Sequence, residues 1–477
     1  MDEMQTKLNR RSFIKAAVAG VGGLPALNVC GQSATTANKP LRVAVIGCGD
    51  GRGLPVLLPE ACKERVVAVV DADSRQIAKA LAIVGKKVSP AAAAEVKAFS
   101  DYRKLFDEMG KELDAVMIAT PNHQHALPAL LAIRRGIHVY VEKPMAHAIA
   151  EARQLREEAK RYGVVTQMGK HGHSSEGCRR LCEYIWAGAI GQVREIICWS
   201  DRANGLPAGP RPPTLPVPEG LDWEQWIGPA PFRDYHEGLH RHSWHRWCDF
   251  GNGSVGNMGN HIIDPAKWAL KLGAPVSVEL EEVCGGNDER WPVSTRIRWD
   301  FPAREGMDPV KLYWYDGLAK GQPYDKKTVG AIDCVTREAQ NRPPLVVELE
   351  KKYNRDFGSD GSLFVGDKGI MIIGPFGEGC RIVPEEAHRA FPLPDKVLPR
   401  IKGTHQSDFF RACRGGAPAC ANFEYSEPLV EIVLLGDLAM LAGAGRRIEW
   451  DGAGMRCTNL PEVNRFLKTT YRNGWRI

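Results

Sequence analysis

The sequence predicts a doubly wound α/β domain built on a parallel sheet, followed by an α+β domain with a mainly antiparallel, open sheet. Strand patterns alternate with helix patterns from residue 41 to residue 162, and this rhythm ends at about residue 165. Short alternating segments separated by Gly, Asp and Pro then follow. A chain of 477 residues is long enough to bury two cores. We therefore expect domains at 39–165 and 166–477, with residues 1–38 as a separate leading segment.

The first domain is predicted from runs rich in Val and Ile, which are typical of buried parallel strands. A helical pattern begins near Ser74, soon after the second of these strands. The predicted strands are 41–46, 66–70, 115–119 and 138–141, and the later helices are 102–109, 126–135 and 148–162.

The second domain is predicted from a different pattern, in which apolar and polar residues alternate over short segments. A Pro-rich stretch at 206–218 indicates a surface loop before these segments. The predicted strands are 193–200, 276–282, 294–301, 311–315, 361–365 and 369–373, and the predicted helices are 178–187, 406–414 and 427–444.

Composition excludes several classes of protein. Hydrophobic residues make up 44% and charged residues 25% of the chain, which is ordinary for a soluble globular protein. The net charge of +6 is mild, and basic residues are interleaved with acidic ones, so we expect no nucleic acid partner. The apolar run at 16–27 is too short to span a bilayer, so we expect no stable membrane span.

The leading segment is similar to a twin-arginine export signal. Arg10 and Arg11 are followed by Phe13 and by the weakly apolar run at 16–27. This pattern predicts export in the folded state to the periplasm. A frayed amphipathic helix is the alternative, and Cys30 leaves a lipid-anchored form open.

A glycine-rich turn follows the first predicted strand, and a helix follows the turn. Glycines allow the backbone to turn sharply and to approach a dinucleotide pyrophosphate closely. Arg52 stands where the strict G-x-G-x-x-G pattern has its last glycine, so a glycine-rich turn without a ligand is the alternative. We expect cofactor contacts from Gly47, Gly49, Asp50, Gly51 and Arg52.

Asp71 lies about twenty residues after this turn, at the end of the second strand. An acidic residue there accepts hydrogen bonds from the adenosine ribose and repels a 2′-phosphate, so NAD is favoured over NADP. Arg75 is near enough to hold a phosphate instead, and Asp73 is an alternative ribose partner.

Two further segments stand at the carboxyl ends of predicted parallel strands, Thr120-Pro121-Asn122-His123 and Glu142-Lys143-Pro144. With the glycine turn, and with 169–174, 253–264 and 361–366, they resemble the Gfo/Idh/MocA oxidoreductases from about residue 41 to the C-terminus. The resemblance implies NAD bound by a Rossmann domain. It adds, as expected cofactor contacts near the nicotinamide, Thr120, Pro121, Asn122, His123, His125, Glu142 and Lys143.

The resemblance places Lys143 between the nicotinamide and the substrate, where its ammonium can stabilise a developing alkoxide. Asn257 and His261 are four residues apart and would share one face of a helix. In many relatives an aspartate stands at the position of Asn257. An asparagine takes up no proton, so His261 would perform acid–base work without a carboxylate beside it. We predict Lys143, His261 and Asn257 as the catalytic residues.

The expected substrate contacts come from the second domain, where aromatic faces and polar donors are suited to a sugar. Asp264 has two expected roles, either orienting the imidazole of His261 or anchoring its segment. We predict no metal, although His171, His173, Cys178 and Cys182 have side chains that zinc binds. The expected substrate contacts are Lys143, Lys170, His173, Trp244, Arg246, Asn257 and Asp264.

Together these features predict an NAD-dependent enzyme that oxidises a carbinol of a sugar, glycoside or polyol by hydride transfer. An NAD-assisted glycoside hydrolase, which oxidises the sugar transiently before elimination, is the first alternative. A non-catalytic sugar-binding protein is the second, since Asn257 replaces a carboxylate. The resemblance further implies a homo-oligomer, a dimer or tetramer, that pairs through the second-domain sheet.

Overall fold

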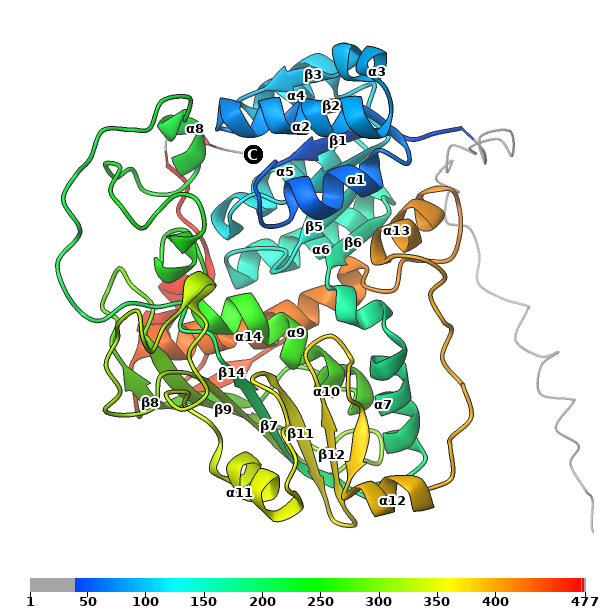
Figure 1. Ribbon diagram of the computed structural model, residues 1–477, viewed down its shortest axis with the longest axis vertical. Helices are drawn as coiled ribbons and strands as arrows, with labels where there is room; N and C mark the ends of the chain where they lie inside the picture. The colour runs from blue at the N-terminus through cyan, green and yellow to red at the C-terminus, as the bar shows by residue number, and fades with distance from the viewer. Residues whose placement is uncertain (1–38, 473, 476–477) are drawn as a thin grey trace, which may run out of the picture. The chain divides into compact units, whose positions relative to one another are not determined.

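The computed structural model describes residues 39–472, 474 and 475, so the predicted export segment at 1–38 lies outside the described residues. The N-terminal domain contains a six-stranded parallel sheet in the order β3-β2-β1-β4-β5-β6 (Figure 1). This is the strand order of a doubly wound dinucleotide-binding fold. Its strands are β1 (Arg42–Ile46), β2 (Arg65–Val70), β3 (Lys97–Phe99), β4 (Ala115–Ile118), β5 (His138–Glu142) and β6 (Thr166–Gly169).

Four of these strands are those predicted, and two were missed because their sequences lack an apolar run. The edge strand β6 pairs in parallel with β5, so the first sheet extends beyond the boundary predicted at residue 165. Val43 and Val45 of β1 face one side of the sheet, whereas Ala44 and Ile46 face the other. Both faces are therefore buried, which explains the continuous apolar runs.

Helices cover both faces of this sheet. One face packs against α4 (Tyr102–Met109), α5 (Ala126–Ile133) and α6 (Ile149–Tyr162), and α4 begins after the capping residue Asp101. The other face packs against α1 (Leu58–Ala61), α2 (Ser74–Lys87) and, from the far end of the chain, α13 (His405–Cys413). The short helix α3 (Pro90–Glu95) lies before β3.

The C-terminal domain contains a nine-stranded sheet in the order β13-β12-β11-β7-β10-β9-β8-β14-β15. The predicted antiparallel pattern is found except between β7 and β10, which are parallel. The strands are β7 (Val193–Ser200), β8 (Ser277–Cys284), β9 (Ser294–Phe301), β10 (Val310–Gly317), β11 (Gly361–Gly366), β12 (Ile370–Ile373), β13 (Arg381–Val383), β14 (Ile448–Asp451) and β15 (Arg456–Cys457).

The inner face of this sheet packs against α7 (Glu176–Trp186), α10 (Asp264–Ala269) and α14 (Phe423–Ala442), and α9 (Asn260–Ile262) adjoins α10 (Figure 1). On the outer face, α11 (Pro344–Tyr353) packs against apolar side chains of β7, β11 and β12. Subunit pairing through this sheet stays a prediction. The remaining helices are α8 (Trp223–Ile227) and α12 (Glu385–Ala390).

Helix α14 joins the two domains. It packs against α6, and one apolar core continues from the first sheet to the second. Arg153 of α6 pairs with Glu431 of α14, and Arg156 pairs with Glu427. No helix in the described residues combines the length and apolar composition that a bilayer-spanning segment requires.

A long segment at 219–250, which we call the aromatic segment, reaches from the second domain to the first and contains α8 (Figure 1). Stacked rings of Trp223 and Trp226, 4.7 Å apart, form the centre of its own small core. Ser74 donates its N–H to the carbonyl of Gly220 over 2.8 Å, which fixes the segment to the start of α2. It therefore faces the carboxyl ends of the parallel strands.

Candidate active site

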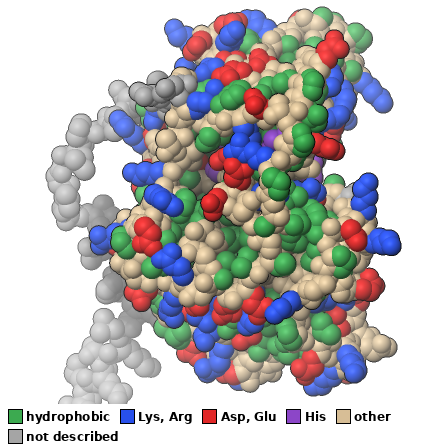
Figure 2. Space-filling model, turned by 90° about the vertical axis from the view of Figure 1, so that its left-hand side faces the viewer, with side chains coloured by type: hydrophobic (Ala, Val, Ile, Leu, Met, Phe, Trp, Pro, Cys, Tyr) green, Lys and Arg blue, Asp and Glu red, His purple; other side chains and the backbone are tan. Residues whose placement is uncertain are grey.

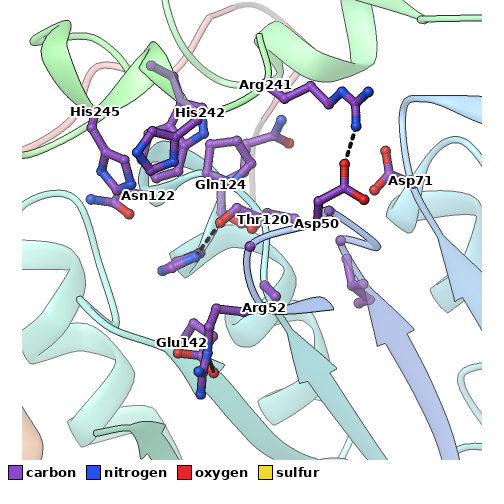
Figure 3. A pocket seen from close by; sticks show the side chains of 18 of the residues that line it. Asp50, Arg52, Asp71, Thr120, Asn122, Gln124, Glu142, Arg241, His242 and His245 are labelled. Atoms are coloured by element: carbon purple, nitrogen blue, oxygen red, sulfur yellow. Dashed lines mark hydrogen bonds and ion pairs between the residues drawn. The ribbon is translucent and has the colours of Figure 1, made fainter. Parts of the chain in front are cut away.

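A cavity of about 600 Å³ lies between the carboxyl ends of the parallel strands and the aromatic segment. Figure 2 shows basic, acidic and histidine side chains gathered in a recess between the two domains. In Figure 3, Arg52 lies beside Glu142 on the strand side, whereas His242 and His245 lie across from it. The predicted residues that line the cavity are Gly47, Gly49, Asp50, Gly51, Arg52, Asp71, Thr120, Pro121, Asn122, His125, Glu142, Lys143, Trp244, Asn257 and His261.

The glycine turn has the shape that a dinucleotide cradle requires. Gly47 has a φ of +88°, and a Cβ there would lie 2.6 Å from the backbone of Ala119. Gly49 and Gly51 line the cavity, and a Cβ on either would meet nothing within 4 Å. Within the described part of the chain, the N–H groups of residues 49–52 donate to no protein acceptor. These N–H groups can bind an anion such as a pyrophosphate.

Arg52 interrupts the glycine pattern without disrupting the turn. Its Nε donates to Glu142 Oε1 over 3.2 Å, so the guanidinium lies along the cavity wall. The next residue, Gly53, makes the close packing, because a Cβ there would lie 2.1 Å from the carbonyl oxygen of Gly47. The chain continues as a π-helical turn, Gly53–Leu57, in which Leu57 N–H donates to the Arg52 carbonyl over 3.0 Å. The wider turn accommodates the residue that displaces the last glycine.

Asp71 fixes the turn to the end of β2. Its two carboxylate oxygens accept from Cys48 N–H over 2.7 Å and from Asp73 N–H over 2.8 Å. Burial of this carboxylate raises its pKa to about 6. Arg75 is paired with Asp73 through two bonds of 2.7 Å, so its guanidinium is engaged away from a phosphate. The residues present therefore fit an adenosine ribose without a 2′-phosphate.

The two strand-end loops are held together by His125, whose ring nitrogens each lie 2.6 Å from a carbonyl oxygen, of Thr120 and of Pro144. Asn122 donates its amide to Asn252 Oδ1 over 2.9 Å, so its own oxygen is left for a ligand in the cavity. These contacts fix the position of the loop that carries Lys143.

Lys143 makes the contact that joins the domains inside the cavity. Its Nζ donates to the backbone oxygen of Asn257 over 2.5 Å and to Asn257 Oδ1 over 2.7 Å. The pKa of Lys143 falls to about 7, because desolvation, assisted by the charges of Arg52 and Arg202, outweighs the opposing effect of Glu142. An amine with this pKa can exchange a proton near neutral pH.

His261 is buried, and its ring lies 4.8 Å from that of Phe376. Burial and the nearby cations Lys143 and Lys170 hold the pKa of His261 well below its ordinary value, so the ring is neutral. Asn257 lies on a π-helical turn, Val255–Gly259, and His261 lies on the following helix α9. Both residues line the cavity.

Buried ring nitrogens without a hydrogen-bond partner in the protein cluster around the same cavity. They are His171 Nε2, His245 Nδ1 and His261 Nδ1, within the described residues. A buried polar atom that lacks a hydrogen bond costs folding free energy, so a cluster of such nitrogens indicates a polar ligand. The hydroxyl groups of a polyhydroxylated molecule could provide uncharged hydrogen-bond partners for several of these nitrogens at once.

Five predicted contacts lie outside the cavity lining. His123 packs between Trp226 and Phe250, with ring nitrogens 3.2 and 3.3 Å from their carbonyl oxygens. Arg246 pairs with Asp333 behind the cavity wall. His123 was expected to contact the cofactor and Arg246 the sugar. Both expectations are corrected, because partners from other parts of the fold hold these side chains outside the cavity.

The other three corrected residues form one buried cluster. Asp264 Oδ2 lies 3.2 Å from Lys170 Nζ and 3.1 Å from His173 Nδ1, and Asp264 Oδ1 accepts from Tyr425 OH over 2.6 Å. Of its two expected roles, Asp264 therefore has the anchoring one, and it does not contact His261. No group of three or more metal-binding side chains occurs among the described residues.

Several cavity residues had no local sequence signal. Arg202 follows β7, and Ile332 and Phe376 come from distant loops, so only the fold brings them together. His242 and His245 stand near the predicted Trp244, and a cluster of His beside Trp was the available signal.

Comparison with known proteins agrees with this geometry. Residues 41–170 match the model of an oxidoreductase family with an NAD-binding Rossmann fold, Gfo/Idh/MocA, and residues 209–299 match the C-terminal alpha/beta domain of that family. The chain thus resembles this oxidoreductase family in both of its domains. Its first domain is accordingly an NAD-binding domain.

Two curated relatives match over about a third of the chain. A 2,7-anhydro-N-acetylneuraminate hydratase of Mediterraneibacter gnavus is 27% identical over 35% of this chain and 40% of its own length. A levoglucosan dehydrogenase of Pseudarthrobacter phenanthrenivorans is 26% identical over 36% of each chain. The matches thus span well under half of these relatives.

A solved structure shares the fold over most of the chain. The aldose-aldose oxidoreductase of Caulobacter crescentus, solved with glycerol, has a TM-score of 0.54 at 18% identity. The match covers 86% of this chain and all of that one, 100%.

Replacing the close-packing glycine tests the turn. Gly53→Ala should lower the free energy of unfolding by roughly 1–3 kcal/mol, because its Cβ overlaps backbone atoms. The matched variant Gly51→Ala should leave the melting temperature in place and weaken NAD binding, because its Cβ points into the cavity. Thermal melts and NAD titrations on both variants separate the two roles, and equal melting temperatures would contradict the packing argument.

Replacing Asp71 tests cofactor choice. Asp71→Asn keeps an oxygen for one of the two backbone N–H groups and removes the charge, so NAD should bind more weakly and the preference over NADP should shrink. Titrating both cofactors against this variant and against Asp73→Asn measures the effect. Unchanged NAD affinity in Asp71→Asn, with loss in Asp73→Asn, would assign the ribose to Asp73.

Proposed function

We propose that this protein is an NAD-dependent oxidoreductase that removes hydride from a carbinol carbon of a sugar, glycoside or polyol. The observation that carries the proposal is the amine of Lys143, held at the cavity by Asn257 with a pKa near 7. The partnerless ring nitrogens around it support a polyhydroxylated substrate. Two of the similar proteins described above are named for sugar substrates, which also supports this class.

Lys143 acts as the base in this proposal. Asn257 accepts two hydrogen bonds from the amine of Lys143. The lone pair of the neutral amine therefore points away from Asn257, toward the cavity. As the C–H bond loses hydride, the O–H proton passes to this amine, and the products are a ketone and an ammonium. NAD, when bound, supplies the hydride acceptor.

His261 holds the substrate in the proposed reaction. Its neutral ring, with a partnerless Nδ1, can hydrogen-bond a second hydroxyl of the sugar. Its depressed pKa makes it a weak base, so Lys143 takes the proton.

An NAD-assisted glycoside hydrolase is the second candidate, since the same first oxidation would open an elimination. The two activities differ in their net products. Net NADH accumulates with a dehydrogenase, whereas the hydrolase returns the hydride and releases an alcohol.

We also propose that the chain is exported to the periplasm by the twin-arginine route and carries NAD with it. Support comes from Arg10, Arg11 and the apolar run at 16–27. The aromatic segment covers the cavity, with Gln124 donating to the carbonyl of Trp226 over 2.7 Å and Arg241 paired with Asp50. Such covering contacts slow the release of a ligand.

Removing the amine tests the base. Lys143→Met should lower kcat by roughly a hundredfold or more and leave NAD titration intact. In the unaltered protein, oxidation should fall as pH drops below about 7, because protonation removes the base. Lys267→Met, which removes a buried lysine outside the cavity, is the matched control. Turnover at the native rate in Lys143→Met would end the assignment.

Retention of the cofactor is tested on protein purified without added nucleotide from fractionated cells. The periplasmic fraction should contain the protein with NAD(H) bound. Arg241→Ala should speed nucleotide release by roughly 2- to 5-fold, as expected for a surface pair. The control Arg211→Ala removes an ion pair outside the cavity. Protein confined to the cytoplasm would contradict export, and nucleotide-free protein would contradict retention.

A further inference from the structure

A single chain of hydrogen bonds runs from the cavity into the second domain. Lys143 donates to Asn257 Oδ1 over 2.7 Å, and Asn257 Nδ2 donates to Asn204 Oδ1 over 2.8 Å. Asn204 Nδ2 then donates to Asp333 Oδ2 over 2.8 Å. Arg246 pairs with both oxygens of Asp333 at the far end. From Lys143 to Asp333, each donor thus points toward Asp333, which accepts from both sides.

The direction of this chain is fixed at Asp333. A carboxylate paired with a guanidinium offers acceptors only, so Asn204 must turn its amide nitrogen toward Asp333. The amide oxygen of Asn204 then faces residue 257, which must donate. Asparagine at 257 can donate to Asn204 and accept from Lys143 at once, whereas aspartate can only accept.

Burial enforces this direction of the hydrogen bonds. Asn204 is fully buried and Asp333 is 1% exposed, so water cannot compensate for two oxygens facing each other. An unmade hydrogen bond in such a place is costly, and a charged oxygen is costlier still. Asp333 thereby selects the side chain that stands beside the lysine.

We propose that Asp333 and Asn204 are positioning residues for Lys143, which keep a neutral acceptor at residue 257 and aim the amine into the cavity. The inference rests on the proposed function, in which Lys143 is the base. A carboxylate at 257 would favour the ammonium form of Lys143 and so hold its proton. The chain instead places the negative charge at Asp333, where Arg246 neutralises it.

Other charged and titratable groups around the amine also affect the pKa of Lys143. None of them is substituted in the test, so they are the same in every variant. Glu142 favours the ammonium, whereas Arg52 and Arg202 oppose it. The remaining groups are the histidines whose charge the amine opposes, His125, His171, His242, His245 and His261.

The test reverses the chain. Asn257→Asp should lower the melting temperature, because the new carboxylate faces the amide oxygen of Asn204, and Asp333→Asn should lower it by unpairing Arg246. In the double variant the new amide at position 333 can donate to Asn204, and Asn204 can donate to the new carboxylate at position 257. The loss in melting temperature should therefore be smaller than the sum of the two single losses. Asn464→Asp removes the hydrogen bond that Asn464 Nδ2 donates to the Cys457 carbonyl, far from the cavity, and should combine additively with Asp333→Asn.

The second readout is the pKa of Lys143 in the protein itself. Competitive acetylation with acetic anhydride across pH, followed by peptide mass spectrometry, measures this pKa without substrate. Asn257→Asp and the double variant should raise it by at least one unit, so that acetylation below that pKa slows about tenfold. If Asn257→Asp does not fold, Asn204→Ala and Asn204→Ala/Asn257→Asp are compared, and the aspartate should then cost little stability.

The outcomes separate this inference from the proposed function. Additive losses in the double variant, or a pKa of Lys143 unmoved by Asn257→Asp, would overturn it. If stability and pKa change as expected while catalysis does not follow the pKa of Lys143, the positioning chain stands and Lys143 is not the base.

Discussion

The contact between Lys143 and Asn257 links the strand-end loop of one domain to a helical turn of the other. A lysine held by two oxygens has a defined direction, whereas a free lysine samples many rotamers. The chemistry of the cavity therefore depends on the two domains keeping one relative position. Much of the remaining structure serves that requirement.

Three features hold this position. Helix α14 continues the apolar core of the second domain onto α6 of the first, and α13 covers the opposite face of the first sheet. Arg153 and Arg156 pair with Glu431 and Glu427 across the same boundary. Buried ion pairs contribute modestly to net stability but penalise misplacement strongly, since a lost partner leaves an unpaired charge. The aromatic segment then closes the cavity from a third side.

Electrostatics inside the cavity follow a consistent pattern. Acidic groups near the reacting end are matched with arginine, as Glu142 is with Arg52 and Asp333 is with Arg246. Asn204 and Asn257 lie between the second of these pairs and Lys143. The amine of Lys143 is thereby left without a dedicated counterion beyond Glu142, which agrees with its pKa of about 7. Neutral histidines complete a surface suited to hydroxyl groups.

The local sequence determined the parallel strands, the glycine turn, Asp71 and the Glu142-Lys143-Pro144 segment, whereas tertiary structure decided which polar residues of the second domain reach the cavity. The first group depends on neighbours within one strand–turn–helix unit, where periodicity and glycine placement have direct physical meaning. Edge strand β6 and the short β3 were missed because they lack apolar runs. Lys170, His173 and Asp264 have the chemistry of a sugar site, yet they satisfy one another in a buried cluster. Arg202, Ile332 and Phe376 line the cavity without any local motif. The sequence by itself determined that Asn257 carries no charge. Only the fold decided that it must donate to Asn204, because the acceptor that sets this direction, Asp333, is distant in the chain and meets it through Asn204 alone.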